Sequence, residues 1–256
     1  MNEERKRYFA NISYNGSNFA GWQKQNNAMT VQQAIEEAIL LAAKEEVSIV
    51  GCGRTDAGVH ASDYYFHFDM NLSDPIFLRK KLNHILSKDI SINKIIEVAP
   101  DAHARFDAFK RSYTYHLAYK RDPFLNDFEW YYPYGKLDLD ALNETASLLL
   151  NYRSFYPFCK SKTQVKTMDC ELIKAYWEAD EENNKLKFHI TANRFLRGMV
   201  RLIVGMCINV ATNKVSLETV KTALEKQERI EKSYSVPATG LFLVNIEYPY
   251  DALLKS

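Results

Sequence analysis

The chain has 256 residues, of which 46% are hydrophobic and 25% charged, and its formal net charge is +1. This length permits one large or two modest domains, and the composition excludes a disordered chain. A net charge so close to zero does not indicate a polyanionic partner by itself. A nucleic-acid surface would have to come from local clusters of basic residues.

The cysteines are far apart in the sequence and form no C-x-x-C pair, which favours buried thiols over a zinc site; they are Cys52, Cys159, Cys170 and Cys207. The start of the chain lacks the apolar segment of a signal peptide, and no apolar stretch approaches the roughly 20 residues of a membrane span. We therefore expect a soluble, cytoplasmic protein.

The first hundred residues predict six elements. Alternating apolar residues indicate a strand over 8–14. Thr30 and Gln33 form a capping-box signal for a helix over 31–42, and Asp74 with Pro75 marks the start of a second helix. Runs of β-branched and aromatic residues predict strands at 47–52, 64–70 and 90–99. The order β-α-β-β-α-β is that of a ferredoxin-like fold.

The pattern restarts near residue 102, with strands at 111–119, 170–180, 185–192 and 240–248 and helices at 138–150, 194–211 and 216–226. We therefore expect an α+β protein with two ferredoxin-like halves, residues 1–101 and 102–256. The two sheets could join edge to edge into one antiparallel sheet with helices on one face. A cleft lined by both halves would then hold the active site.

The segment "GCGRTDAGVHA", residues 51–61, places Arg54 and Asp56 between an apolar and an aromatic run. A purely structural turn would use Gly53 and Gly58 for positive φ and pair the two charges. A nucleotide cradle, a zinc deaminase and a two-carboxylate glycosidase each lack the required spacing or residues. Because charges held near a core cost desolvation, the turn is a candidate functional site.

Three further groups of residues are candidates. Arg194, Arg197 and Arg201 share one stripe of the apolar predicted helix 194–211, so a buried Arg201 needs a carboxylate such as Asp56. His60 and His67 could act as bases, although packed histidines are more common. Basic clusters are either solvated faces or an RNA track; they lie at 5–7, Lys24, 110–111, 120–121 and 153–166, the last with Phe155, Tyr156 and Phe158.

Six segments together resemble the tRNA pseudouridine synthase A family, in family order from residue 14 to 249. They are "YNGSNFAGWQKQ", "GRTDAGVHA", "HARFDA", "RSYTYHL", "FLRGMVRLIVG" and "GLFLVNIEYP". The resemblance implies a homodimeric enzyme without cofactor or metal. Its substrate would be tRNA, with uridine isomerised to pseudouridine on the 3′ side of the anticodon arm (tRNA positions 38–40).

The family's motifs also imply roles for four residues. Asp56 is the expected nucleophile, with Arg54 two residues before it. Tyr113 is expected to stack on the substrate base, and Arg201 to pair with the nucleophile. Breaking and remaking a bond to the same sugar suits one carboxylate that acts covalently and is released unchanged. The base must first be flipped out of its stack at a cost of a few kcal/mol.

The sequence departs from the family pattern at two places. Asp63 and Tyr64 stand where the family often has Gly-Gln, and Gly198 stands where a polar residue is common. Neither change affects Asp56 or Arg201, so only the choice of uridine within the anticodon arm is placed in question. The alternative reading is a catalytically silent RNA-binding protein of the same fold.

Overall fold

The computed structural model describes residues 5–160, 166–182, 184–249 and 253. The chain forms two compact units: one contains the residues up to Lys110 together with those from Leu243 onward, and the other contains Arg111–Phe242. Each unit combines mainly antiparallel strands with helices, which confirms the α+β class. Within the described ranges, no helix is both long and apolar enough to cross a membrane.

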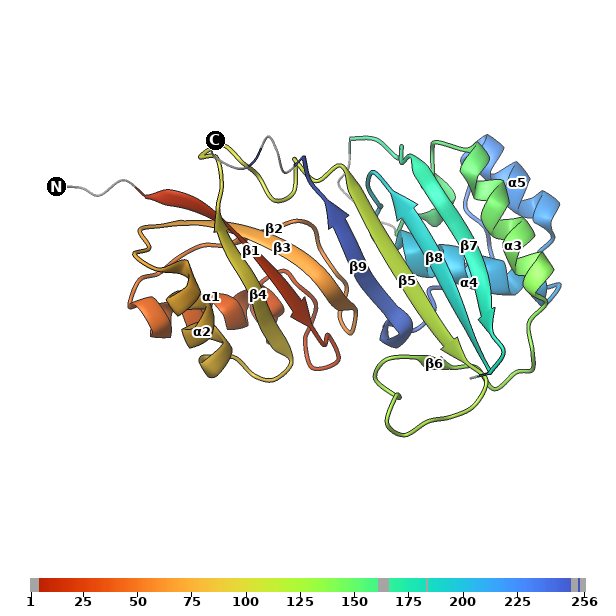
Figure 1. The fold of residues 1–256 in the computed structure, drawn as a ribbon. Helices are drawn as coiled ribbons and strands as arrows, with labels where there is room; N and C mark the ends of the chain where they lie inside the picture. Colours follow the sequence, from red (N-terminus) through yellow and green to blue (C-terminus); the bar gives the residue numbers. More distant parts are fainter. Residues whose placement is uncertain (1–4, 161–165, 183, 250–252, 254–256) are drawn as a thin grey trace. The chain divides into compact units, whose positions relative to one another are not determined.

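The first unit has the predicted β-α-β-β-α-β order (Figure 1). Its elements are β1 (Lys6–Tyr14), α1 (Val31–Ala43), β2 (Val50–Gly51), β3 (His60–Met70), α2 (Pro75–Ile85) and β4 (Ile90–Glu97). β1 lies between β4 and β3 and is antiparallel to both, and β9 (Leu241–Glu247) follows β3 in the strand order. The helices α1 and α2 pack against each other, and α2 also packs against β4.

Aromatic cross-strand pairs form the core of this unit. In the β1–β3 register Tyr8 lies opposite Phe68 and Ala10 lies opposite Phe66, and all four residues are at most 1% exposed. The intervening residues of β1 point to the other face, where Phe9 contacts His67 at 6.2 Å between ring centres. Both faces of this sheet therefore carry packed side chains.

The predicted strand over 47–52 is correct only at its end, where Val50 and Gly51 pair with β3 and the N–H of Cys52 donates to the carbonyl of Tyr65 at 2.8 Å. The backbone groups of Ile49 form hydrogen bonds with side chains of α1. Its N–H donates to Oε1 of Glu36 at 3.3 Å, and its carbonyl accepts from Nε2 of Gln32 at 3.2 Å. Side chains of α1 thus replace the strand ladder at this residue.

The second unit has the strand order β5-β8-β7, with helices packed on one another beside the strands (Figure 1). Its elements are β5 (Lys110–Ala118), β6 (Trp130–Tyr131), α3 (Leu139–Leu148), β7 (Leu172–Asp180), β8 (Lys185–Ala192), α4 (Met199–Ala211) and α5 (Leu217–Lys226). β7 and β8 form the predicted hairpin. Asn143 of α3 bonds both backbone groups of Trp177 at 2.7 and 3.0 Å and so protects the outer edge of β7.

The helix α4 begins at Met199, five residues later than predicted. Gly198 precedes it with a φ of 70°, a left-handed conformation that cannot continue an α-helix upstream. Arg194 and Arg197 consequently lie outside the helix, and the predicted stripe of three arginines does not exist. Arg201 alone lies within its first turn.

Candidate active site

The turn that carries Arg54 and Asp56 connects β2 to β3. It closes where the N–H of Val59 donates to the carbonyl of Asp56 at 3.2 Å. Gly58 adopts a φ of 77°, whereas Gly53 is not among the residues with positive φ, so the prediction for the two glycines is correct for Gly58 alone. Arg54 is exposed and Asp56 is partly exposed. The charged residues thus reach solvent while Thr55 between them is buried.

Thr55, between the two charged residues, is held from two sides. Its carbonyl accepts from the backbone N–H of Trp22 at 3.3 Å. Its hydroxyl lies 2.8 Å from the hydroxyl of Tyr14, at the end of β1. Both Thr55 and Tyr14 are buried. This anchoring fixes the backbone of the turn on either side of Thr55.

The loop between β1 and α1 packs directly against the turn through Gly21. A Cβ on Gly21 would lie 2.5 Å from the carbonyl oxygen of Thr55 and 3.1 Å from the carbonyl carbon of Asp56. Its φ of 90° also favours glycine. In the same loop, Phe19 accepts from the N–H of Gly58 at 3.3 Å. The family-like "YNGSNFAGW" segment therefore supports the Asp56 turn.

Tyr64 of β3 contacts the turn through its side chain. Its hydroxyl donates to the carbonyl of Gly53 at 2.5 Å, and its ring centre lies 4.2 Å from that of Trp22. Burial raises the pKa of Tyr64 well above its ordinary value, so the hydroxyl remains a donor. A Cβ on Gly51 would lie 2.2 Å from this hydroxyl oxygen. The departure from the family pattern at residue 64 therefore contacts the site.

His60 and His67 are both buried and hydrogen-bonded, which confirms the packed interpretation. Nδ1 of His60 accepts from the N–H of Gly16 at 3.1 Å, and Nδ1 of His67 accepts from the N–H of Ala104 at 3.1 Å. An Nδ1 that accepts a backbone N–H is already occupied, so it is not available to remove a proton from a substrate.

Arg201 contacts the loop that precedes β9. Its Nε donates to the carbonyl of Val236 at 2.7 Å, and its own carbonyl accepts from the N–H of Val236 at 3.3 Å. The next residue, Pro237, accepts from the hydroxyl of Tyr115 at 2.9 Å. Burial raises the pKa of Tyr115, while the positive charge of Arg201 opposes that shift. The second unit thus gathers Arg201, Tyr115 and this loop.

Tyr113 lies two residues before Tyr115 in β5 but has a different environment. Tyr115 is fully buried, whereas Tyr113 is half-buried. The ring of Tyr113 meets Phe195 edge to face, with 5.1 Å between the ring centres. The structure therefore distinguishes the two tyrosines, which the sequence register places on the same face. Tyr113 is the one whose ring remains partly accessible.

The predicted site residues fall into two groups. The first unit brings Arg54 and Asp56 together on one turn, and the second unit carries Tyr113 and Arg201. The ion pair between Asp56 and Arg201 stays a prediction. Among the described residues, no group of three or more His, Cys, Asp or Glu side chains is arranged to hold a metal ion.

The basic segment 153–166 differs from its prediction in one respect. Phe155 and Phe158 are fully buried and belong to the core, so they offer no stacking surface to RNA. Arg153 is exposed and Lys160 is half-buried. Residues 161–165 of this segment, and residue 183 of the hairpin turn, lie outside the described residues.

Two features of the site escaped sequence reasoning. The support that Tyr64 gives to Gly53, and the contact of Gly21 with Thr55, both join residues distant in sequence. The only sequence signal for Gly21 was its place in a family-like segment. Tyr64 was noted in the sequence as a departure from the family pattern within an aromatic strand, but that pattern does not indicate its contact with Gly53.

The comparisons with known proteins follow the same segments. A family model described as tRNA pseudouridine synthase matches residues 10–107 and 151–249, which include the Asp56 turn and Arg201. The chain belongs to this family. The matched ranges cover most of both units, so membership extends well beyond the signature turn.

Named relatives match the chain over almost its full length. The tRNA pseudouridine synthase A of Parabacteroides distasonis is 45% identical over 95% of this chain and 96% of its own. That of Porphyromonas gingivalis is 42% identical over 97% and 99%. That of Staphylococcus aureus is 34% identical over 97% and 94%.

Proposed function

We propose that the protein isomerises uridine to pseudouridine in the anticodon arm of tRNA, with Asp56 as the nucleophile. Its membership of the tRNA pseudouridine synthase family makes it an isomerase that acts on tRNA uridines. The observation that supports Asp56 is the turn itself. A partly exposed carboxylate is carried by a backbone that Thr55, Tyr14 and Trp22 hold in place. Such fixed geometry is what a covalent catalyst requires.

The reaction places simple demands on these residues. The C–N bond between uracil and ribose breaks, the base rotates, and a C–C bond forms to the same sugar carbon. The ring carbon that joins the sugar loses a proton, and the freed nitrogen gains one, so the reaction is balanced without an oxidant or reductant. The carboxylate of Asp56 can form a temporary covalent bond and leave unchanged.

The other three predicted residues act on the flipped base and on the nucleophile. Tyr113 has a partly accessible ring for base stacking, supported at its edge by Phe195. Arg54 is exposed, so its guanidinium can enter the space that a flipped base leaves or contact a phosphate. Arg201 pairs with the carboxylate of Asp56 in this proposal.

Replacing Asp56 tests the proposal directly. Asp56→Asn keeps the shape of the side chain but removes the nucleophile, so turnover should fall by roughly 10³-fold or more. The affinity for tRNA should stay within a few-fold, because the basic surface is unchanged. Tritium release from uridine-labelled tRNA measures turnover, and filter binding measures affinity. Turnover close to that of the unaltered enzyme would exclude Asp56 as the nucleophile.

A double-mutant cycle tests the pairing with Arg201. Arg201→Met should abolish turnover and destabilise the fold by about 1–3 kcal/mol, because the carbonyl of Val236 also loses its donor. Adding Asp56→Asn should recover part of that stability without activity, because the carboxylate is no longer left without its cation. Urea unfolding of the four proteins measures the coupling. Strictly additive losses would show that the two side chains do not interact.

The remaining parts of the proposal concern the assembly and the target. A homodimer that acts in the cytoplasm on the 3′ side of the anticodon arm agrees with the family resemblance. Sedimentation would establish the oligomeric state, and mapping pseudouridines in treated tRNA would identify the modified positions. The alternative of a silent RNA-binding protein gains no support, because the relatives reported above are named as synthases.

A further inference from the structure

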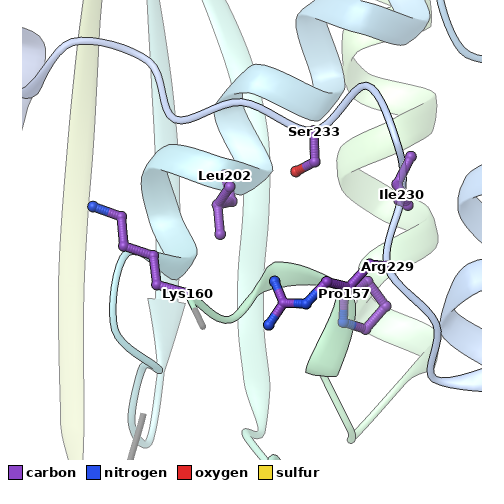
Figure 2. A pocket seen from close by; sticks show the side chains of 6 residues that line it. All are labelled: Pro157, Lys160, Leu202, Arg229, Ile230 and Ser233. Carbon is purple, nitrogen blue, oxygen red and sulfur yellow. The ribbon is translucent and has the colours of Figure 1, made fainter. Parts of the chain in front are cut away.

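The second unit contains a cavity beside the start of α4 (Figure 2). Its volume of about 240 Å³ is well above the roughly 10–15 Å³ that one water molecule needs. The lining residues come from the segment before the undescribed residues 161–165, from α4, and from the chain after α5. They are Pro157, Lys160, Leu202, Arg229, Ile230 and Ser233. Two of them are cationic and none is acidic.

Arg229 presents a guanidinium that is already fixed in place. Its Nη1 donates to the carbonyl of Cys159 at 2.9 Å, and the group lies over the ring of Tyr156, 5.0 Å from the ring centre. The side chain is nevertheless exposed, so the cavity can be reached from solvent. A guanidinium held by one N–H and by a ring face keeps other N–H groups for a ligand, and its rotamer is already restricted.

Ser233 supplies a second donor group to the cavity. Its hydroxyl oxygen is buried, and it has no hydrogen bond within the described part of the chain. In Figure 2 this oxygen faces the space between Leu202 and Arg229. Buried hydroxyls are normally satisfied, because an unsatisfied one destabilises the fold. A bound acceptor at this position would satisfy the hydroxyl.

Lys160 lines the cavity beside Leu202, with its ammonium directed away from Arg229 and Ser233 (Figure 2), and Gly198 provides the space for its stem. A Cβ on Gly198 would lie 2.8 Å from Cε and 2.9 Å from Cδ and Cγ of Lys160. The backbone N–H of Lys160 also donates to the carbonyl of Arg197 at 3.1 Å. Gly198 is one of the two departures from the family pattern. In this chain, the departure lets the lysine stem lie across the start of α4.

We propose that this cavity binds a phosphate group, namely one phosphodiester of the tRNA backbone. Arg229 and Ser233 would donate to its oxygens, and the stem of Lys160 would line the cavity. A fixed guanidinium with a hydroxyl donor and no lining carboxylate is suited to an oxyanion. Glu228 and Glu231 are close in sequence but do not line the cavity. This inference rests on the proposed function, because it takes tRNA as the ligand.

The charge of Arg229 is tested by the salt dependence of tRNA binding. Arg229→Gln should weaken binding and reduce the slope of log affinity against log salt by roughly 0.7–0.9, the value for one phosphate contact. Lys221→Gln is the matched control, because it removes one exposed charge from α5 without altering the cavity. An equal change in both variants, or no change in Arg229→Gln, would overturn the proposal.

The variant Ser233→Ala tests whether the hydroxyl of Ser233 binds a ligand or simply lacks a hydrogen bond. If the hydroxyl serves no ligand, removing it should raise thermal stability and leave tRNA affinity unchanged, and this result would contradict the proposal. If it donates to a phosphate, affinity should fall several-fold although the fold is no less stable. The slope against salt should stay the same, because no charge is lost.

Inorganic phosphate distinguishes the two sources of the ligand. A backbone phosphodiester predicts that the variants lose tRNA affinity, and that millimolar phosphate competes for the same site in the unaltered protein. If phosphate stabilises the unaltered protein and not Arg229→Gln, while tRNA affinity is identical in both, the cavity serves a small anion and the proposal is wrong. The Asp56 assignment is tested by the turnover of Asp56→Asn and this proposal by tRNA affinity and its salt dependence, so failure of one is distinct from failure of the other.

Discussion

Three histidines of the first unit accept backbone N–H groups at Nδ1. The donors are Gly16 for His60, Ala104 for His67, and Arg105 for His103, each at 3.1 Å. The rings of His67 and His103 also meet, with 4.6 Å between their centres. Protonation at Nδ1 would break these bonds, which agrees with the lowered pKa of His67 and of His103. The "HARFDA" segment is attached to the sheet in this way.

His67 therefore makes stability depend on pH. Burial, with smaller effects from Arg7 and His103, lowers its pKa from 6.5 to about 4, while Asp69 and Asp107 act in the opposite direction. The unfolded chain binds the proton more readily, so this contribution to stability is complete above pH 6.5 and is lost as the pH falls toward 4. We expect the free energy of unfolding to fall by on the order of 2 kcal/mol over this window.

Urea unfolding between pH 7 and pH 4.5 measures that loss. His67→Gln should be less stable at pH 7 and should show a smaller decrease with falling pH. His84→Gln is the control, because His84 is exposed at the end of α2. The carboxylate of Asp69, whose pKa the adjacent Arg7 lowers, titrates below this window in both variants. Identical pH profiles for His67→Gln and the unaltered protein would contradict the assignment.

At the scale of elements, the Asp56 turn depends on two neighbours, the loop after β1 and the strand β3. Gly21 shows how closely the loop approaches. With a φ of 90° and the carbonyl of Thr55 at 2.5 Å from any added Cβ, Gly21→Ala combines backbone strain with a steric clash. We expect it to lower the free energy of unfolding by about 2 kcal/mol or more and to reduce turnover.

Gly53→Ala is a matched comparison within the turn itself. Gly53 has ordinary φ, and no heavy atom lies within 4 Å of an added Cβ. This variant should unfold within about 0.5 kcal/mol of the unaltered protein and retain most of its activity. Thermal unfolding and tritium release on both variants provide the comparison. If Gly53→Ala is the more damaging change, the support described for the turn is incorrect.

The sequence predicted elements well where the signal was local. Thr30 and Asp74 cap α1 and α2 as predicted, with their side chains accepting from backbone N–H groups of the first turn. The predictions from the sequence were wrong where contacts with residues distant in the chain determine the local structure. Ile49 leaves its strand because Gln32 and Glu36 bind its backbone. The left-handed conformation of Gly198 cannot be deduced from an apolar pattern.

The candidate site shows the same difference between features with a local sequence signal and features that depend on distant contacts. Arg54 and Asp56 were identified from an unusual turn between apolar runs, which is a local property. The roles of Tyr64 and Gly21 depend on which residues the fold places against that turn. The expected pairing of Arg201 with a carboxylate stays a prediction. Its Nε donates to the carbonyl of Val236, a partner that no charge pattern indicates. Backbone acceptors of this kind have no sequence signature.

At the scale of the whole molecule, the net charge is only +1, so electrostatic affinity for tRNA must come from local clusters of basic residues. If several Lys and Arg residues neutralise phosphates, log affinity should fall against log salt with a slope of several units, at roughly 0.7–0.9 per contact. Filter binding between 50 mM and 200 mM salt measures this slope. Substituting Arg153 and Lys160 together should reduce the slope by the equivalent of about two phosphate contacts. A flat plot would mean that the clusters are only solvated.

The assignment of the chain from Leu243 onward to the first unit has a consequence for synthesis. The N–H of Ile246 donates to Asp63, the hydroxyl of Tyr248 donates to Ala104, and the carbonyl of Leu253 accepts from Ala99. A ribosome that adds roughly 5–20 residues per second therefore makes the turn of Asp56 many seconds before the residues that complete its unit. During that interval the unit lacks its last strand. The unit that carries the nucleophile is complete only after the residues from Leu243 onward have been synthesised.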